Sequence, residues 1–251
     1  MQLDEKTFNP GSESQLPEKV MPMPSSALIV GAGSGLSAAL ARKCCAAGMN
    51  VALAARDGEK AGAAANETGA ALHRCDAASI EDVARLFAAL DATTGTPDLV
   101  VYNPAARLRG PITELDPVAT RAAIEVTCFG AFLVAQQAAR RMLERGSGSI
   151  FFTGASAGVK GFANSSVFAM GKFGLRGLAQ SLARELHPQN IHIGHFVIDG
   201  GIRPARAGGQ DDGTDNMLDP DAIAEAYMQF HEQHRSAWAW EVELRPWVER
   251  F

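Results

Sequence analysis

The sequence lacks the features that mark membrane and nucleic-acid-binding proteins. Its 23 lysines and arginines are scattered among 28 acidic residues, and the formal net charge is −5. Without a basic block, we expect no nucleic-acid partner and no anionic membrane surface as partner. No apolar run approaches the roughly 18 residues that suggest a membrane span. The N-terminus has no apolar segment typical of a secretory signal, so we expect a cytoplasmic protein.

Cysteine is scarce and is not arranged for metal binding. The four cysteines form no C-x-x-C pair and have no histidines at metal-ligand spacing. We therefore expect no metal site and four reduced thiols that pack as small apolar side chains. They are Cys44, Cys45, Cys75 and Cys128.

The rest of the composition is typical of a globular protein. The chain has 251 residues, of which 47% are hydrophobic and 20% charged, enough for one well-buried core. Residues 1–24 hold several prolines and no apolar period, which predicts a flexible N-terminal arm. We expect residues 25–251 to form a single domain, because an α/β fold of this length is usually one domain.

Strand and helix patterns alternate along this domain. Short apolar runs predict strands at 27–30, 51–54, 71–73, 99–102, 150–153 and 191–198, and an alternating pattern within 236–247 predicts a last strand. Helical patterns begin after Gly35, at Asp57, at Ser79, at Asp116, before Leu175 and at Asp219. This alternation predicts an α/β fold with a doubly wound parallel sheet, a Rossmann fold, whose ligands bind at the carboxyl ends of the strands.

A glycine-rich segment lies between the first strand and the first helix, where a dinucleotide-binding loop belongs. Gly31, Gly33, Ser34, Gly35 and Leu36 are its central residues. Glycines there permit a tight turn and let backbone N–H groups approach a pyrophosphate at the helix N-terminus. We expect these five residues to bind a cofactor, with Ser34 as a further phosphate contact.

The end of the second predicted strand indicates which nicotinamide cofactor is used. An acidic residue there would select NAD, but this chain has Ala55 followed by Arg56. A guanidinium offers donors suited to the 2′-phosphate of NADP, so we favour NADP (NADPH) over NAD. The alternative is that Arg56 is a solvated surface charge and that Asp57 only caps the next helix.

Together with three later segments, these motifs resemble the short-chain dehydrogenase/reductase family over residues 25–205. The loop fits that family's G-x-x-x-G-x-G pattern with serine for the last glycine, and Asp76, Asn103, Ala105 and Ile202 follow strands three, four and six as in the family. The resemblance implies that Asp76 contacts the adenine, that Asn103 and Ala105 line the cofactor, and that Ile202 meets the nicotinamide carboxamide. It also implies a homodimer or homotetramer acting on a small-molecule substrate.

The same resemblance exposes an incomplete catalytic set. Family members use an asparagine, a serine, a tyrosine and a lysine, and in register these positions hold Thr127, Ala155, Phe168 and Lys172. Only the lysine, which the resemblance places at the nicotinamide ribose, is retained. Phenylalanine at the tyrosine position resembles an atypical subgroup of the family. A positioned general acid contributes roughly 10²–10⁴-fold in rate, so its loss disfavours ordinary ketone reduction.

Other residues are candidates to replace the missing donors. Asp199 at the end of strand six is the main candidate acid, and the alternative is a structural carboxylate that bonds to nearby backbone N–H groups or to an arginine such as Arg203. We expect Ser156 to point away, and Asn164, Ser165 and Ser166 to cap the helix that follows. Weaker candidates are Tyr102 and Cys128, whereas His195 is expected to be packed.

Two functions follow from this pattern. The first is an NADP-dependent oxidoreductase with a degenerate catalytic tetrad, which reduces a pre-activated acceptor such as an imine. The alternative is a non-catalytic NADP-binding redox sensor or scaffold protein. The polar, glycine-rich segment 200–219 is predicted to be a substrate lid, or else a plain surface loop.

Overall fold

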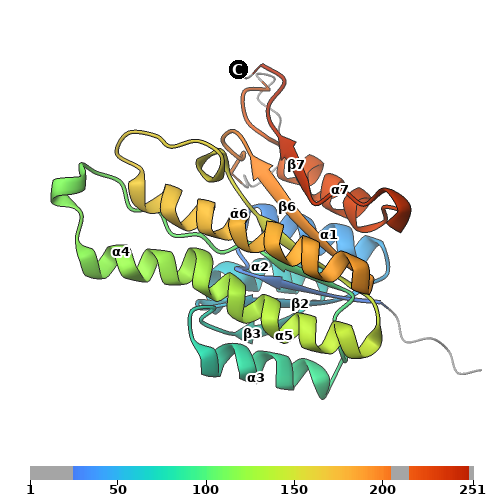
Figure 1. The fold of residues 1–251 in the computed structure, drawn as a ribbon. Helices are drawn as coiled ribbons and strands as arrows, with labels where there is room; N and C mark the ends of the chain where they lie inside the picture. Colours follow the sequence, from blue (N-terminus) through green and yellow to red (C-terminus); the bar gives the residue numbers. More distant parts are fainter. Residues whose placement is uncertain (1–24, 205–214, 249–251) are drawn as a thin grey trace, which may run out of the picture.

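The protein folds around one parallel sheet. The computed structural model describes residues 25–204 and 215–248. In this part of the chain seven strands pair in the order β3-β2-β1-β4-β5-β6-β7, and every pairing is parallel (Figure 1). The strands are β1 (Ser26–Val30), β2 (Asn50–Ala55), β3 (Ala71–Arg74), β4 (Leu99–Tyr102), β5 (Gly148–Thr153), β6 (Ile191–Ile198) and β7 (Glu241–Leu244). The predicted doubly wound sheet is thereby confirmed, although β7 is shorter than the alternating segment that predicted it.

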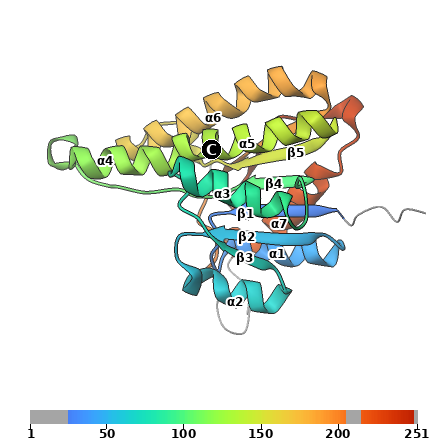
Figure 2. The same ribbon diagram turned by 90° about the horizontal axis from the view of Figure 1, so that it is seen from below.

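Helices cover both faces of the sheet (Figure 2). Helices α3, α5 and α6 pack against one face, and α1, α2 and α7 pack against the other. The helices are α1 (Leu36–Ala46), α2 (Gly58–Thr68), α3 (Ile80–Asp91), α4 (Pro117–Ile124), α5 (Gly130–Arg145), α6 (Ser166–Leu186) and α7 (Pro220–His231).

The alternation of strand side chains explains the two layers. In β1, Leu28 and Val30 belong to the core under α3, α5 and α6, whereas Ala27 and Ile29 belong to the core under α1 and α7. All four are buried. Successive strand residues point to opposite faces, so a strand that is apolar at every position must be covered twice.

Local capping fixes where the helices begin. The Asp57 and Asp219 carboxylates accept hydrogen bonds from the second residue inside α2 and α7, at 2.9 and 2.8 Å. The Ser79 hydroxyl and the Asp116 carboxylate accept from the third residue of α3 and α4, at 3.1 and 2.7 Å. Each cap satisfies a backbone N–H that has no partner within the helix, which is why these helix starts could be predicted.

One long helical stretch differs from expectation. Pro117–Arg145 runs through α4, a π-helical turn (Glu125–Phe129) and α5, and is by length and composition apolar enough to cross a membrane. No apolar run in the sequence had predicted such a stretch. In the fold, residues of α5 such as Val134 and Ala138 are fully buried against the sheet, so the apolar side of this helix is part of the protein core.

Two predicted segments lie wholly or partly outside the described residues. The predicted arm, residues 1–24, is one, and the central part of the predicted lid, 205–214, is the other. The described ends of the lid segment pair with each other, because Leu218 donates to the Gly201 carbonyl and accepts from the Arg203 N–H, both at 2.8 Å.

Candidate active site

The glycine-rich loop forms a tight turn at the carboxyl end of β1. Gly31 has φ +83°, and a Cβ at this residue would lie 2.7 Å from the Pro104 nitrogen. The Gly31 and Ala32 N–H groups both donate to the Ala54 carbonyl at the end of β2, at 2.9 and 3.0 Å. Only glycine combines that backbone conformation with this close approach.

Gly33 and Gly35 are not required by contacts within the protein, and instead leave space in front of α1. A Cβ on Gly33 or Gly35 would meet no protein atom within 4 Å. Gly35 precedes α1, whose first turn carries no side-chain cap and no acidic residue. Open space in front of uncapped helix N–H groups is what an approaching pyrophosphate requires. The predicted roles of Gly33, Ser34, Gly35 and Leu36 therefore fit the geometry, and the loop fits a dinucleotide.

A cavity of about 310 Å³ lies at the carboxyl ends of β1, β2 and β3. Arg56, Asp57, Lys60 and Asp76 line it. Asp57 caps α2, as the alternative interpretation held, while Arg56 makes no hydrogen bond or ion pair with any other described residue. Lys60, which the sequence analysis did not single out, adds a second positive charge. The two cations make this cavity suited to an anionic group on the adenosine side of a cofactor.

Asp76 is held in place by its neighbours. Its backbone N–H donates to Asp82 at 2.9 Å, and its side chain accepts from the Ala78 N–H at 3.1 Å. The carboxylate thus has an ordered position in the wall of the cavity.

Asn103 joins this cavity to a larger one. Its side-chain amide donates to the Ser37 hydroxyl at 2.8 Å, and Ser37 donates to the Gly31 carbonyl at 2.9 Å. Asn103 and Ala105 line both cavities. The order of strands changes direction between β1 and β4, so the loops that follow them separate and leave a crevice there. An elongated two-part ligand fits this arrangement.

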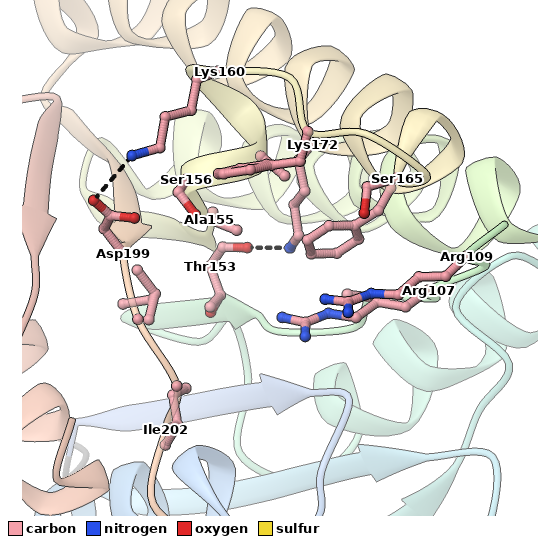
Figure 3. A pocket seen from close by; sticks show the side chains of 18 of the residues that line it. Arg107, Arg109, Thr153, Ala155, Ser156, Lys160, Ser165, Lys172, Asp199 and Ile202 are labelled. Carbon is pink, nitrogen blue, oxygen red and sulfur yellow. Dashed lines mark hydrogen bonds and ion pairs between the residues drawn. The ribbon is translucent and has the colours of Figure 1, made fainter. Parts of the chain in front are cut away.

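The larger cavity, about 880 Å³, contains the lysine predicted to be catalytic. Lys172 lies on α6, is 2% exposed, and donates from Nζ to the Thr153 carbonyl at 2.6 Å (Figure 3). Burial, followed by the positive charge of Arg107, lowers the pKa of Lys172 from 10.5 to about 7. A lysine in this state can give or take a proton at neutral pH.

The positions that lack the usual donors lie around Lys172. Phe168 precedes it by one helical turn, and Phe168 and Ala155 are both buried lining residues of the same cavity. Thr127 is buried in the π-helical turn, where its hydroxyl accepts from the Ala106 N–H at 3.0 Å. Thr127 therefore supports the loop after β4.

Asp199 at the end of β6 is part of the cavity wall but has two cationic partners. Its carboxylate lies 3.6 Å from Lys160 (Figure 3). It also lies 3.3 Å from Arg245. Arg203, the partner suggested from sequence, pairs with Asp219 instead. The geometry supports a counter-ion role for Asp199 more directly than a role as acid.

Two serines behave differently from expectation. Ser156 was expected to point away, but it begins a 3₁₀ turn (Ser156–Gly158) and lines the large cavity. Ser165 stands at the N-cap position of α6, yet its side chain makes no capping hydrogen bond and also lines the cavity. The expectation for Ser156 assumed that side chains alternate along a strand from Ala155 to Ser156, but β5 ends at Thr153.

Two arginines at this site were missed by the sequence analysis. Arg107 and Arg109 follow β4 and line the large cavity, and Figure 3 shows both side chains reaching into it. The Arg107 guanidinium lies 4.6 Å from the centroid of the Phe168 ring. The signal that could have identified them is their place in the loop after β4, since loops at the carboxyl ends of parallel strands surround the ligand site.

The weaker candidates have structural roles. Tyr102 is buried and donates to the Val126 carbonyl at 2.5 Å, which supports the π-helical turn. The Cys128 sulfur lies against α6, where a Cβ on Gly174 would be 2.8 Å away. His195 is fully buried, as expected, and its Nδ1 lies 2.9 Å from Glu241. Burial lowers the pKa of His195 to about 4.

Two of the four cysteines, Cys44 and Cys75, are buried, and Cys45 and Cys128 are half-buried. All four cysteines are free, and burial raises the pKa of each thiol. Among residues 25–204 and 215–248, no group of three or more histidine, cysteine, aspartate or glutamate side chains could hold a metal ion.

Comparison with known proteins identifies relatives of this fold and site. Residues 25–206 match the family described as short chain dehydrogenase. The chain is 30% identical to the 3-oxoacyl-[acyl-carrier-protein] reductase MabA of Mycobacterium tuberculosis over 66% of this chain and 65% of that reductase. It is 30% identical to the 2,5-dichloro-2,5-cyclohexadiene-1,4-diol dehydrogenase of Sphingobium indicum over 84% of this chain and 86% of that enzyme.

Solved structures of short-chain dehydrogenases and oxidoreductases superpose on this chain. A short-chain dehydrogenase from Rhodopseudomonas palustris superposes with a TM-score of 0.76 at 35% identity, covering 89% of this chain and all of that one. A metagenomic short-chain oxidoreductase in complex with NADP superposes with a TM-score of 0.78 at 28% identity, covering 89% of this chain and 98% of that one.

Proposed function

The chain belongs to the short chain dehydrogenase family, and from this premise we propose that it is an NADP-dependent oxidoreductase that reduces a pre-activated acceptor such as an imine. The observation that carries the proposal is the buried Lys172, which faces an 880 Å³ cavity beside positions that lack both the usual hydroxyl donors. The cavity and the lysine also favour an enzyme over a redox sensor or scaffold, for which neither is required.

The cofactor would be held by the elements already described. The loop 31–36 would receive the pyrophosphate at the N-terminus of α1, and Asp76 would face the adenine. Arg56, helped by Lys60, would pair with the 2′-phosphate, which is the reason to prefer NADP over NAD. Ile202 and Lys172, which line the large cavity with Asn103 and Ala105, would contact the nicotinamide half. When bound, NADPH supplies a hydride.

The protein's own contribution is control of a proton. Lys172, with a pKa of about 7, is partly protonated at neutral pH, and its ammonium can pass a proton to the nitrogen of a neutral imine in the cavity. Protonation by Lys172 would make the C=N carbon able to accept a hydride, which would give an amine, and solvent would return the proton to Lys172. Asp199 is the alternative proton donor.

The charges of the cavity favour an acceptor that arrives neutral at its nitrogen. Two like charges about 5 Å apart cost about 3 kcal/mol at an effective dielectric constant of 20. Four cationic side chains line the cavity among the described residues, so a permanent iminium cation is repelled as it enters. A ketone is disfavoured for another reason, since its alkoxide needs strong donors at the positions of Ala155 and Phe168.

A direct experiment separates these possibilities. NADPH should raise the thermal transition of the protein by several degrees and NADH by much less, and NADPH should be consumed with cyclic imines but not with matched ketones. Turnover that survives Asp199→Asn and is abolished by Lys172→Met would assign the proton to Lys172. Absence of a shift with either cofactor would refute the proposal at its first step, and binding without turnover of any imine, ketone or quinone would favour the sensor or scaffold.

We also propose a homodimer or homotetramer that acts in the cytoplasm. Helices α5 and α6 expose large apolar side chains, among them Phe132, Met170 and Phe173. Apolar residues gathered on helix surfaces are typical of subunit interfaces. Light scattering at increasing protein concentration tests this, and a monomer at all concentrations would refute it.

A further inference from the structure

Among the residues that the structure describes, the lining of the large cavity carries more positive than negative charge. Arg107, Arg109, Lys160 and Lys172 line it, and Asp199 is the only acidic lining residue within 25–204 and 215–248. Asp199 is already within ion-pair distance of Lys160 and of Arg245, which is not a lining residue. The two arginines therefore have no counter-ion among the described residues of the cavity wall.

The guanidinium groups of Arg107 and Arg109 are also free of other polar contacts. Neither forms a hydrogen bond or an ion pair with a residue in 25–204 or 215–248. Arg107 does make a cation–π contact, because its guanidinium lies over the Phe168 ring at 4.6 Å from the ring centroid. The charge of Arg107 acts inside the cavity, because it contributes to the lowered pKa of Lys172. An anion bound between these cationic groups would lower the electrostatic repulsion between Arg107 and Lys172.

The backbone that carries the two arginines is held at both ends. The Ala106 N–H donates to the Thr127 hydroxyl at 3.0 Å, and the Gly110 N–H donates to the Asn164 carbonyl at 3.1 Å. Arg107 and Arg109 are two residues apart, and both side chains reach into the same cavity (Figure 3). The guanidinium donors of both arginines therefore extend from a backbone segment whose two ends are held by hydrogen bonds.

We propose that Arg107 and Arg109 form a subsite for a carboxylate group of the substrate, so that the acceptor reduced beside Lys172 is a small organic acid. This inference rests on the proposed function, because it places the acceptor in the same cavity. Guanidinium groups match carboxylates in bidentate geometry. The inference also gives Phe168 a role: its ring supports the guanidinium of Arg107 by a cation–π contact, in place of the proton transfer that a tyrosine would perform.

The test uses the full chain loaded with NADP⁺ and three carboxylate–carboxamide pairs, built on benzene, cyclohexane and pyridine rings. Isothermal titration calorimetry should give at least tenfold tighter binding for the carboxylate of one or more pairs. Arg107→Gln and Arg109→Gln should each weaken that carboxylate at least tenfold and leave its carboxamide unchanged. Arg140→Gln removes an exposed charge on α5 outside both cavities and should change neither affinity.

Arg107→Lys keeps the charge but loses the fork of donors, and should give an intermediate loss. It also serves as the second variant if a glutamine substitution impairs folding.

Several results would overturn the inference. These are equal affinity for carboxylate and carboxamide in every pair, no binding of any carboxylate, or an unchanged carboxylate affinity in both glutamine variants. A large loss of NADP⁺ affinity in the same variants would assign the arginines to the cofactor and overturn it as well. NADPH binding and turnover of neutral imines are measured separately, so the inference can fail while the proposed function stands.

Discussion

Replacing Lys172 by methionine should stabilise the protein at pH 6 and lose that advantage at pH 10. Lys172 is buried, and burial together with Arg107 lowers its pKa from 10.5 to about 7. At about 1.4 kcal/mol per pKa unit, this drop corresponds to about 5 kcal/mol of penalty on the protonated form in the folded state. Methionine has a similar length and no charge, so it removes that penalty.

The sign and the pH window follow from proton linkage. The folded-state pKa is the lower one, so between pH 7 and 10.5 the unfolded chain binds a proton that the folded chain does not. Stability due to Lys172 therefore rises with pH through this window and is lowest below pH 7. Methionine loses the hydrogen bond to the Thr153 carbonyl, worth about 1–2 kcal/mol. The expected net effect is about 3 kcal/mol of stabilisation at pH 6 and a loss of about 1 kcal/mol at pH 10.

Urea denaturation at closely spaced pH values between 6 and 10 measures this difference. The wild type and the variant share the four cysteines, so titration of those thiols cancels in the comparison. Lys60→Met, at an exposed lysine of α2, is the matched control and should run parallel to the wild type. Parallel curves for Lys172→Met and the wild type would refute the account of a lysine that titrates near neutral pH.

Three further predictions concern the cofactor loop and the catalytic positions. Gly33→Ala should keep wild-type stability and weaken NADPH binding at least tenfold, because its Cβ would enter the open space expected to hold the cofactor. Gly31→Ala should instead lower the free energy of unfolding by more than about 2 kcal/mol, because of its positive φ and the contact with Pro104. Equal NADPH affinity in Gly33→Ala and the wild type would contradict the loop assignment. Arg56→Ala should weaken NADPH roughly 10–100-fold and leave NADH unchanged, since it removes a charge-assisted contact worth about 1.5–3 kcal/mol; equal losses for both cofactors would contradict the 2′-phosphate contact. Phe168→Tyr alone should produce no ketone reductase activity in an NADPH-consumption assay, because the hydroxyl missing at Ala155 stays missing; strong ketone turnover would mean that only the tyrosine had been lost.

The parts of the fold that depend on local sequence could be predicted. The starts of α2, α3, α4 and α7 were predicted because Asp57, Ser79, Asp116 and Asp219 each cap the helix that follows, and capping involves residues only two or three positions apart. The strands that are covered on both faces of the sheet were predicted because they are apolar at every position. The place of the glycine loop between β1 and α1 could also be predicted, because it follows from the order of the local patterns.

The parts that depend on tertiary contacts could not be predicted. The π-helical turn is supported by the Tyr102 hydroxyl on the Val126 carbonyl and by the packing of Thr127 on Gly171, contacts between distant elements. The side chain of Arg107 points into the cavity from a loop that is held by hydrogen bonds to Thr127 and Asn164, residues distant in the sequence. The partner of Asp199 was misjudged because Arg245 approaches from the segment after β7.

The most direct test of the central claim is NADPH oxidation by a cyclic imine that bears a carboxylate on the reacting carbon, compared with a ketone that bears a carboxylate at the same position. 1-Pyrroline-2-carboxylate and the five-carbon α-keto acid 2-oxopentanoate are a usable pair, followed by nicotinamide absorbance at pH 7. We predict turnover of the imine and at least 100-fold slower reduction of the ketone, in line with the rate that a missing general acid costs. Reduction of the ketone at the rate of the imine, or no oxidation of NADPH with either, would contradict the account.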